Sequence, residues 1–329
     1  MSFTAFKLLF GHLEKAGLVQ SRDLCPTPFQ GKLPYQLQYL GGYAPGIENI
    51  LCILVSFFHP IFQPEAATHT PFVLDFLASA SACVVFPILE ASRSKRPLLL
   101  GFPLLMGAIY QLFTMGVTFP AYWAVFLSIT RDHAVGSQIA QADAEAVLFG
   151  LVMGFFLPSF AMAYIATAHP IALWQAFPVL ISLFGWLHRL LRPRRLYNSS
   201  GYRTVQATYI LTFILSAVVH LRTLAGYNFD PQTIITVLIP SLAIPDAKKG
   251  DTSLTAIVHF LQWDAVFLFG STYVASLWLA RSVVQGILLL SWIVISTAMF
   301  GPGAAVSGIF LWREARLNHA RKVLKTKAH

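Results

Sequence analysis

Long apolar runs that contain almost no charge dominate this chain. The stretches 144–168, 254–280 and 283–312 each contain one formally charged side chain or none. A helix of about 20 apolar residues crosses the roughly 30 Å hydrocarbon core of a bilayer. Only 11% of the residues are charged, whereas ordinary soluble domains have about 25%. The sequence therefore predicts a protein that lies in lipid.

Ten apolar segments are candidate spans, and helix is the expected structure for each. A chain in lipid must satisfy its backbone polar groups internally, and the continuous apolar runs lack the alternation of a barrel strand. We predict an all-α, polytopic integral membrane helix bundle of about eight to ten spans, of which 118–130 and 234–244 are short. The segments are 46–62, 71–91, 98–115, 118–130, 144–168, 170–191, 205–221, 234–244, 254–280 and 283–312.

The predicted organisation is one membrane domain with short flanking segments. Phe3, Phe6 and Phe10 recur at helical spacing, which predicts an amphipathic, interfacial segment within residues 1–44; a frayed tail is the alternative. The transmembrane domain is expected at 45–312, followed by a basic cytoplasmic tail at 313–329.

Three cysteines, Cys25, Cys52 and Cys83, make an odd number, and two of them fall in apolar spans. We therefore expect no disulfide framework.

Basic residues cluster at 93–96, at 188–195, at Lys248 and Lys249, and in the C-terminal tail. Short cytoplasmic loops collect Lys and Arg, so we predict that these clusters share the cytoplasmic side and that both termini are cytoplasmic. The net charge of +9 then fits contact with anionic lipid, and nucleic acid is not an expected partner.

Asp264 is the deepest ionisable group, about ten residues into an apolar run. Helical spacing places Phe260, Phe267 and Trp278 on its face; together with the neighbouring Trp263 they are candidate substrate-binding residues. An acid among aromatic rings suits a pocket in which the acid delivers a proton and ring faces stabilise the resulting cation. The alternative is an ordinary hydrogen bond between membrane helices.

Two further acids are candidate catalytic residues. Glu48 opens the first span with His59, a substrate-binding candidate, on the same stripe; the alternative is an acid favoured by the helix dipole. Asp75 lies in the second turn of the next span, which is too far in for a simple cap. Glu90 precedes Arg93 by three residues, which predicts an interfacial ion pair.

Several motifs are missing, and their absence narrows the chemistry. No GxxxxGK[ST] or GxGxxG motif supports nucleotide binding. No DDxxD or NDxxD segment could hold magnesium for diphosphate ionisation, and no histidine pair has zinc spacing. We predict no cofactor and no metal, so that a cyclisation would have to start by protonation.

Three stretches resemble a known family: PGIENILCILVSFFHP, TPFVLDFLA and HFLQWDAVF. They are similar to a family of fungal membrane-bound terpene cyclases of meroterpenoid pathways, of the ascochlorin, ascofuranone and macrophorin type. The resemblance implies metal-independent cyclisation of a farnesyl chain on an aromatic or quinone-derived head group, in the endoplasmic reticulum membrane. It carries over Glu48 and Asp264 as the acids.

The combined hypothesis is that buried Asp264 carries a proton at neutral pH and shares it with Glu48 through a hydrogen bond. An epoxide is favoured over an alkene as its target, because oxygen offers a lone pair. The expected partners are a prenylated substrate, the bilayer and other pathway enzymes. A secondary-metabolite transporter and a non-catalytic membrane scaffold are the alternatives.

Overall fold

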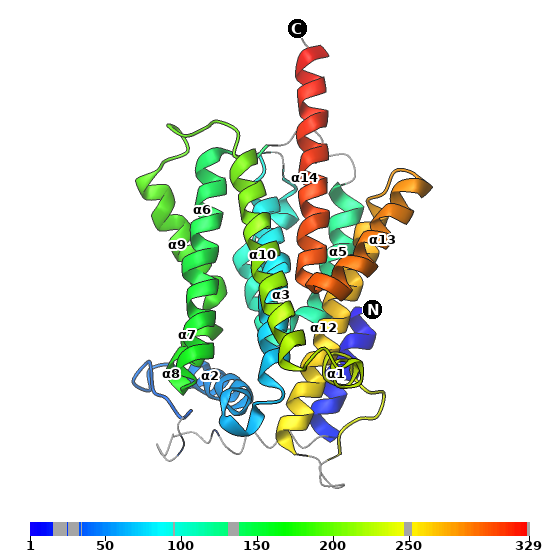
Figure 1. The fold of residues 1–329 in the computed structure, drawn as a ribbon. Helices are drawn as coiled ribbons and strands as arrows, with labels where there is room; N and C mark the ends of the chain where they lie inside the picture. Colours follow the sequence, from blue (N-terminus) through cyan, green and yellow to red (C-terminus); the bar gives the residue numbers. More distant parts are fainter. Residues whose placement is uncertain are drawn as a thin grey trace.

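The computed structural model describes residues 1–15, 25, 33, 35–94, 96–130, 138–246 and 252–327. Within these ranges the regular secondary structure is helical. The prediction of an all-α fold is therefore confirmed (Figure 1). The α-helices are α1 (Ser2–Lys15), α2 (Pro45–Phe58), α3 (Thr70–Ala91), α4 (Pro103–Phe113), α5 (Met115–Thr130), α6 (Gln141–Leu151), α7 (Leu157–Ile165), α8 (Ala168–Gln175), α9 (Phe177–Leu191), α10 (Tyr202–Gly226), α11 (Pro231–Leu238), α12 (Ser253–Trp278), α13 (Val283–Phe300) and α14 (Pro302–Lys327).

Among the described residues, six helical stretches are long and apolar enough to cross a membrane, or seven if the bent pair α8 and α9 is one span. The predicted count of eight to ten is not confirmed. The sequence between 98 and 130 forms two helices, α4 and α5, each shorter than a span, and α11 has only 8 residues.

The exposed surface of the bundle supports its placement in lipid. Helix α13 is apolar on all sides, yet only 17% of its residues are buried, and Val283, Ile287 and Leu288 are exposed. Helix α3 lies at the centre, and 89% of the residues in its most apolar 18-residue window are buried. Apolar side chains that face outward from a helix of this length are expected to meet acyl chains.

Two junctions between consecutive helices lie in the interior of the bundle. Helices α4 and α5 meet at Thr114, and α13 and α14 meet at Gly301, both with positive φ (67° and 87°). Figure 1 shows α13 descending to about half the height of the bundle and α14 rising from there to the C-terminus. The single apolar segment predicted at 283–312 is therefore broken, and the boundary predicted at 312 falls inside α14.

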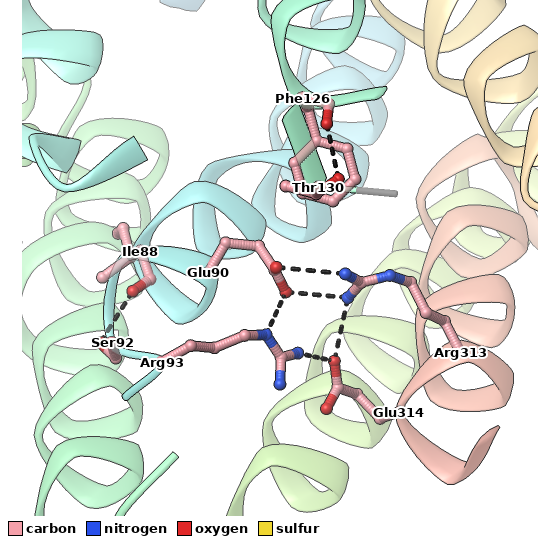
Figure 2. Close-up of polar contacts among 8 residues, drawn as sticks. All are labelled: Ile88, Glu90, Ser92, Arg93, Phe126, Thr130, Arg313 and Glu314. Carbon is pink, nitrogen blue, oxygen red and sulfur yellow. Dashed lines mark hydrogen bonds and ion pairs between the residues drawn. The ribbon is translucent and has the colours of Figure 1, made fainter. Parts of the chain in front are cut away.

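A buried network of four charges fastens α14 to α3 (Figure 2). Arg313 binds both oxygens of Glu90 at 2.8 and 3.1 Å, and Arg93 donates from Nε to Glu90 Oε1 at 2.8 Å. Glu314 completes the network by accepting from Arg93 and Arg313. The predicted Glu90–Arg93 pair is confirmed, but it is buried instead of interfacial, because α14 covers it.

The basic clusters gather at the end of the bundle that carries the C-terminal half of α14. Arg321 donates to Gln138 and Ser200, while Arg189 and Arg194 pair with Asp143. Lys248 and Lys249 lie outside the described residues. One shared end is what the distribution of basic residues predicts for a cytoplasmic face.

A disulfide joins Cys25 to Cys52 of α2. Helix α2 lies at the opposite end of the bundle (Figure 1). The expectation that the cysteines form no disulfide is therefore wrong for this pair; the odd cysteine is Cys83, which is buried and free. The error came from treating Cys52 as a residue in mid-span, whereas Cys25 lies against α2 and also accepts a hydrogen bond from Asn49.

Helix α1 packs against α5 and α12, and its placement at the membrane interface stays a prediction. Ala5 and Leu9 are completely buried there, whereas Phe3 is exposed. The Phe3, Phe6, Phe10 spacing marked a helix correctly, but the buried face is centred on smaller residues between these rings.

Candidate active site

A cavity of about 440 Å³ lies in the bundle between α1, α2, α3, α4, α8 and α12. This volume falls within the range of about 300–1,000 Å³ typical of small-molecule sites. Aromatic and aliphatic side chains form most of its wall, and Asp264 is the only carboxylic acid among the described residues that line it. The lining residues are Phe10, Ile53, Leu54, Phe57, Phe58, Phe76, Leu77, Ala80, Tyr110, Gln111, Leu112, Thr114, Met115, Phe155, Trp174, Gln175, Phe177, Phe260, Leu261 and Asp264.

Asp264 projects from the middle of α12 toward the α4–α5 junction. Its Oδ1 accepts a hydrogen bond of 2.6 Å from the backbone N–H of Gly116, in the first turn of α5. The Thr114 hydroxyl lies beside the same carboxyl group. The first-turn N–H groups of a helix have no partner within that helix, and they favour negative charge. The α5 N-terminus therefore holds the carboxyl group and stabilises its conjugate base.

Glycine at 116 is required by the close approach of α5 to α12. A Cβ atom there would lie 2.6 Å from Asp264 Oδ1 and 2.7 Å from the Asp264 main-chain oxygen. The indole N–H of Trp123 donates to Thr272 at 2.9 Å further along the same pair of helices. The position of the acid thus depends on a tight helix–helix contact.

Glu48 lies in the first turn of α2, where its Oε1 accepts from the backbone N–H groups of Leu40 and Gly42. The predicted hydrogen bond between Glu48 and Asp264 is not formed, and Glu48 does not line the cavity. His59, at the other end of α2, contacts Gln63, while its neighbours Phe57 and Phe58 face the cavity. The stripe predicted on α2 therefore points away from Asp264.

Asp75 faces α10 on the far side of α3 from the cavity. Its Oδ2 lies 2.7 Å from Nδ1 of His220, and Ser79 contacts its other oxygen. Phe76 and Leu77, the next two residues of α3, line the cavity. Asp75 is therefore paired with His220 and does not line the cavity.

Of the aromatic residues predicted around Asp264, the structure places one in the cavity and three outside it. Phe260 lines the cavity and packs edge-on against Phe57, with ring centroids 5.5 Å apart. Trp263 and Phe267 pack against each other outside it. Trp278 is 71% exposed, because it lies about 21 Å further along the helix axis than Asp264 and beyond the cavity.

Sequence reasoning missed the residues that come from α4 and α8. Tyr110, Gln111 and Thr114 precede the junction, and Trp174 and Gln175 end α8. Gln111 and Gln175 are polar amides within apolar segments. Their position could have marked them as candidate binding residues. Thr114 could not be marked in this way, because nothing in the sequence shows that a helix breaks there.

Within the ranges that the structure describes, no three His, Cys, Asp or Glu side chains gather as a metal site.

The family model of the CtvD domain matches residues 1–317. The chain belongs to the CtvD family. The predicted resemblance to fungal meroterpenoid terpene cyclases is confirmed by this match and by the relatives.

The CtvD-family chain is 25% identical over 276 residues to terpene cyclase janA of Penicillium janthinellum, covering 80% of this chain and 76% of janA. It is 22% identical over 242 residues to terpene cyclase ctvD of Aspergillus terreus, covering 69% and 70%. The FAD-dependent monooxygenase verC1 of Penicillium polonicum is 23% identical over 197 residues, 54% of this chain but 24% of verC1. No solved structure matches the chain significantly.

Proposed function

We propose that this protein is a membrane-bound terpene cyclase in which Asp264 protonates a terminal epoxide on a farnesyl-type chain carried by a meroterpenoid head group. The observation that carries the proposal is a single carboxyl group in an aromatic cavity, with one oxygen held by the Gly116 N–H. Family membership and the two relatives named terpene cyclases support the same activity.

The proposed first step uses the two oxygens of Asp264 differently. Burial disfavours the ionised form of a carboxyl group, and the proposed step requires Asp264 to carry a proton when the substrate binds. Oδ1 accepts from Gly116, which leaves Oδ2 to carry that proton. As the proton passes to the epoxide oxygen, the α5 N-terminus stabilises the carboxylate that forms. In this proposal the acid is neutral before the step, and the Gly116 N–H stabilises its anion after it.

The cation is then handled by the cavity wall. The epoxide C–O bond breaks at its more substituted carbon, and internal alkenes capture the positive charge and form the rings. The faces of Phe57, Phe260 and Trp174 stabilise that charge. Loss of a proton, or capture by an oxygen that then loses one, ends the reaction and allows Asp264 to be reprotonated. The product is an isomer of the substrate, and no oxidant is consumed.

An epoxide is preferred to an alkene for a further reason. The monooxygenase verC1 contains a region similar to more than half of this chain. Introducing one oxygen atom into an alkene is the chemistry that makes an epoxide, so a monooxygenase is a suitable supplier of this substrate.

The test uses microsomes from cells that express the protein, incubated with an epoxyfarnesyl phenol with and without a chelator. We expect a cyclised isomer of unchanged mass and altered retention time, formed equally well with chelator. Asp264→Asn should lower its rate by about 10² to 10⁴-fold, the usual contribution of a general acid.

The matched control is Asp230→Asn, at the exposed N-cap of α11, where Asn caps a helix as well as Asp does. This variant should retain the wild-type rate. Unchanged substrate with wild-type protein, for both the epoxide and the alkene form, would contradict the proposal.

Transport of a secondary metabolite is the rival function. The α4–α5 junction beside the buried Asp264 is the observation that favours it, because broken helices form the substrate sites of many transporters. Reconstituted vesicles distinguish the two functions: a transporter moves the prenylated phenol unchanged, whereas a cyclase converts it without a gradient. A non-catalytic scaffold would do neither.

We also propose that the protein resides in the endoplasmic reticulum with its basic end in the cytoplasm. The Cys25–Cys52 disulfide at the opposite end supports this orientation, because disulfides form in the oxidising lumen. The sequon Asn198-Ser199-Ser200 lies at the basic end and should therefore carry no glycan. A shift in gel mobility on glycosidase treatment would show that the basic end faces the lumen instead.

A further inference from the structure

Two glutamines form a polar pair in the otherwise largely apolar cavity wall. Gln111, in the last turn of α4, donates from Nε2 to both the main-chain oxygen and the side-chain Oε1 of Gln175, each at 3.0 Å. Gln175 ends α8 and is only 7% exposed. Both side chains line the cavity that contains Asp264.

The direction of each amide follows from this bonding. A main-chain carbonyl oxygen only accepts, so Gln111 must turn its NH₂ group toward Gln175. That NH₂ group then meets the side-chain oxygen of Gln175 and leaves the Gln175 NH₂ group pointing away. The Gln175 Nε2 atom is buried and has no hydrogen-bond partner in the part of the chain that the structure describes.

A buried, unpaired NH₂ group loses its hydrogen bonds to water and gains nothing in return. Such a group is expected to be satisfied by something that enters the cavity. Because an NH₂ group only donates, that partner must be a hydrogen-bond acceptor, and an oxygen of the substrate is one.

We propose that the Gln175 NH₂ group binds an oxygen of the head group of the substrate, and that Gln111 holds it in position. The proposal rests on the cyclase function proposed above and adds a specificity residue to it. Gln111 lies three residues before Thr114, which borders Asp264. A substrate held by its head at Gln175 therefore lays its prenyl chain along the aromatic wall, with its far end able to reach the acid.

The test compares Gln175→Leu with wild type on two substrates: an epoxyfarnesyl phenol and the matching epoxyfarnesyl benzene, which lacks the head-group oxygen. For the phenol, the variant should raise KM about tenfold with kcat within about twofold, the loss expected for one hydrogen bond that positions but does not react. For the benzene analogue, wild type and variant should have equal KM values, because neither can form that bond.

The matched control is Gln285→Leu, on α13 in a separate, lipid-facing groove, which should leave both KM values unchanged. Equal KM values of Gln175→Leu and wild type on the phenol would overturn the proposal. An equal rise on both substrates would also overturn it, because that result indicates a general loss of cavity shape or contact with the epoxide oxygen.

Binding is measured separately, as the rise in Tm that each compound causes in wild type and in Gln175→Leu. If wild type binds the phenol but does not cyclise it, the proposed function fails, and the Gln175 proposal is decided by the Kd values alone. It then stands if the variant weakens binding of the phenol about tenfold and leaves binding of the benzene analogue unchanged, and it falls otherwise.

Discussion

Both interior helix junctions have a residue with positive φ, and a buried acid lies near each. The two acids differ in the groups that they contact. At α4–α5, Asp264 accepts from the Gly116 N–H and lines a cavity. At α13–α14, Gly301 lies against His220, which is paired with Asp75, while the Ala304 N–H donates to Ser216. Among the described residues the first acid has no charged partner, which suits a proton donor. The second is paired with a histidine and closes a helix contact.

The comparison teaches that burial alone does not mark a catalytic acid. Asp75 is 3% exposed and Asp264 is 5% exposed, so the two are equally buried. They differ in the nearest polar group and in contact with the cavity. Buried charges are normally paired, which makes the unpaired one the better candidate for chemistry.

Among the variants that compare the two junctions, Gly116→Ala should have the largest effect, and it tests the first junction. The added Cβ would meet both Asp264 Oδ1 and the Asp264 main-chain oxygen, so α5 must move and the acid is displaced. We expect the cyclisation rate to fall about 100-fold, as for other displacements of about 1 Å in active sites. Product formation in microsomes, normalised to folded protein, measures it.

Gly301→Ala is the counterpart at the second junction and serves as the control. It strains a backbone with φ of 87° and crowds His220 at 2.9 Å, so it should lower Tm with little change in rate per folded molecule. A loss of rate equal to that of Gly116→Ala would contradict the conclusion that only the first junction positions the catalytic acid.

Asp75→Asn tests whether the paired acid is structural. It weakens a charge-assisted hydrogen bond to His220, which should reduce the free energy of unfolding by about 2 kcal/mol. Thermal denaturation in detergent measures the loss. The rate per folded molecule should remain within about threefold of wild type; a loss of 100-fold or more would make Asp75 part of the chemistry after all.

Glu48→Gln should have a smaller effect. The Gln side-chain oxygen can still accept from Leu40 and Gly42, so we expect a rate within about twofold of wild type. The same product assay measures it. A large loss of rate with an unchanged Tm would restore Glu48 as a proton donor.

Trp278→Ala should have the smallest effect. The side chain is 71% exposed on the outer surface of α12, and substitutions away from packed features usually change stability by no more than about 0.5 kcal/mol. Rate and Tm should both match wild type. A rise in KM here would mean that the substrate also contacts the outer surface of the bundle.

The sequence predicted those parts of this protein that depend on local composition. Uncharged runs long enough to cross lipid determined the helical membrane fold, since no other element satisfies its backbone there. The run from 254 to 280 identified Asp264 as an acid out of place, and Phe260, one turn earlier, shares its cavity. Three short stretches were sufficient to indicate the family.

The tertiary structure decided what composition leaves open. Two helices end at Thr114 and Gly301 inside apolar sequence, where hydropathy does not change. The tertiary fold also decided which acids are paired: Asp75 meets His220 across 145 residues, and Glu90 meets Arg313 across 223. Whether a buried acid is paired or alone depends on which side chain of a distant helix lies beside it, and helical periodicity describes only the acid's own helix.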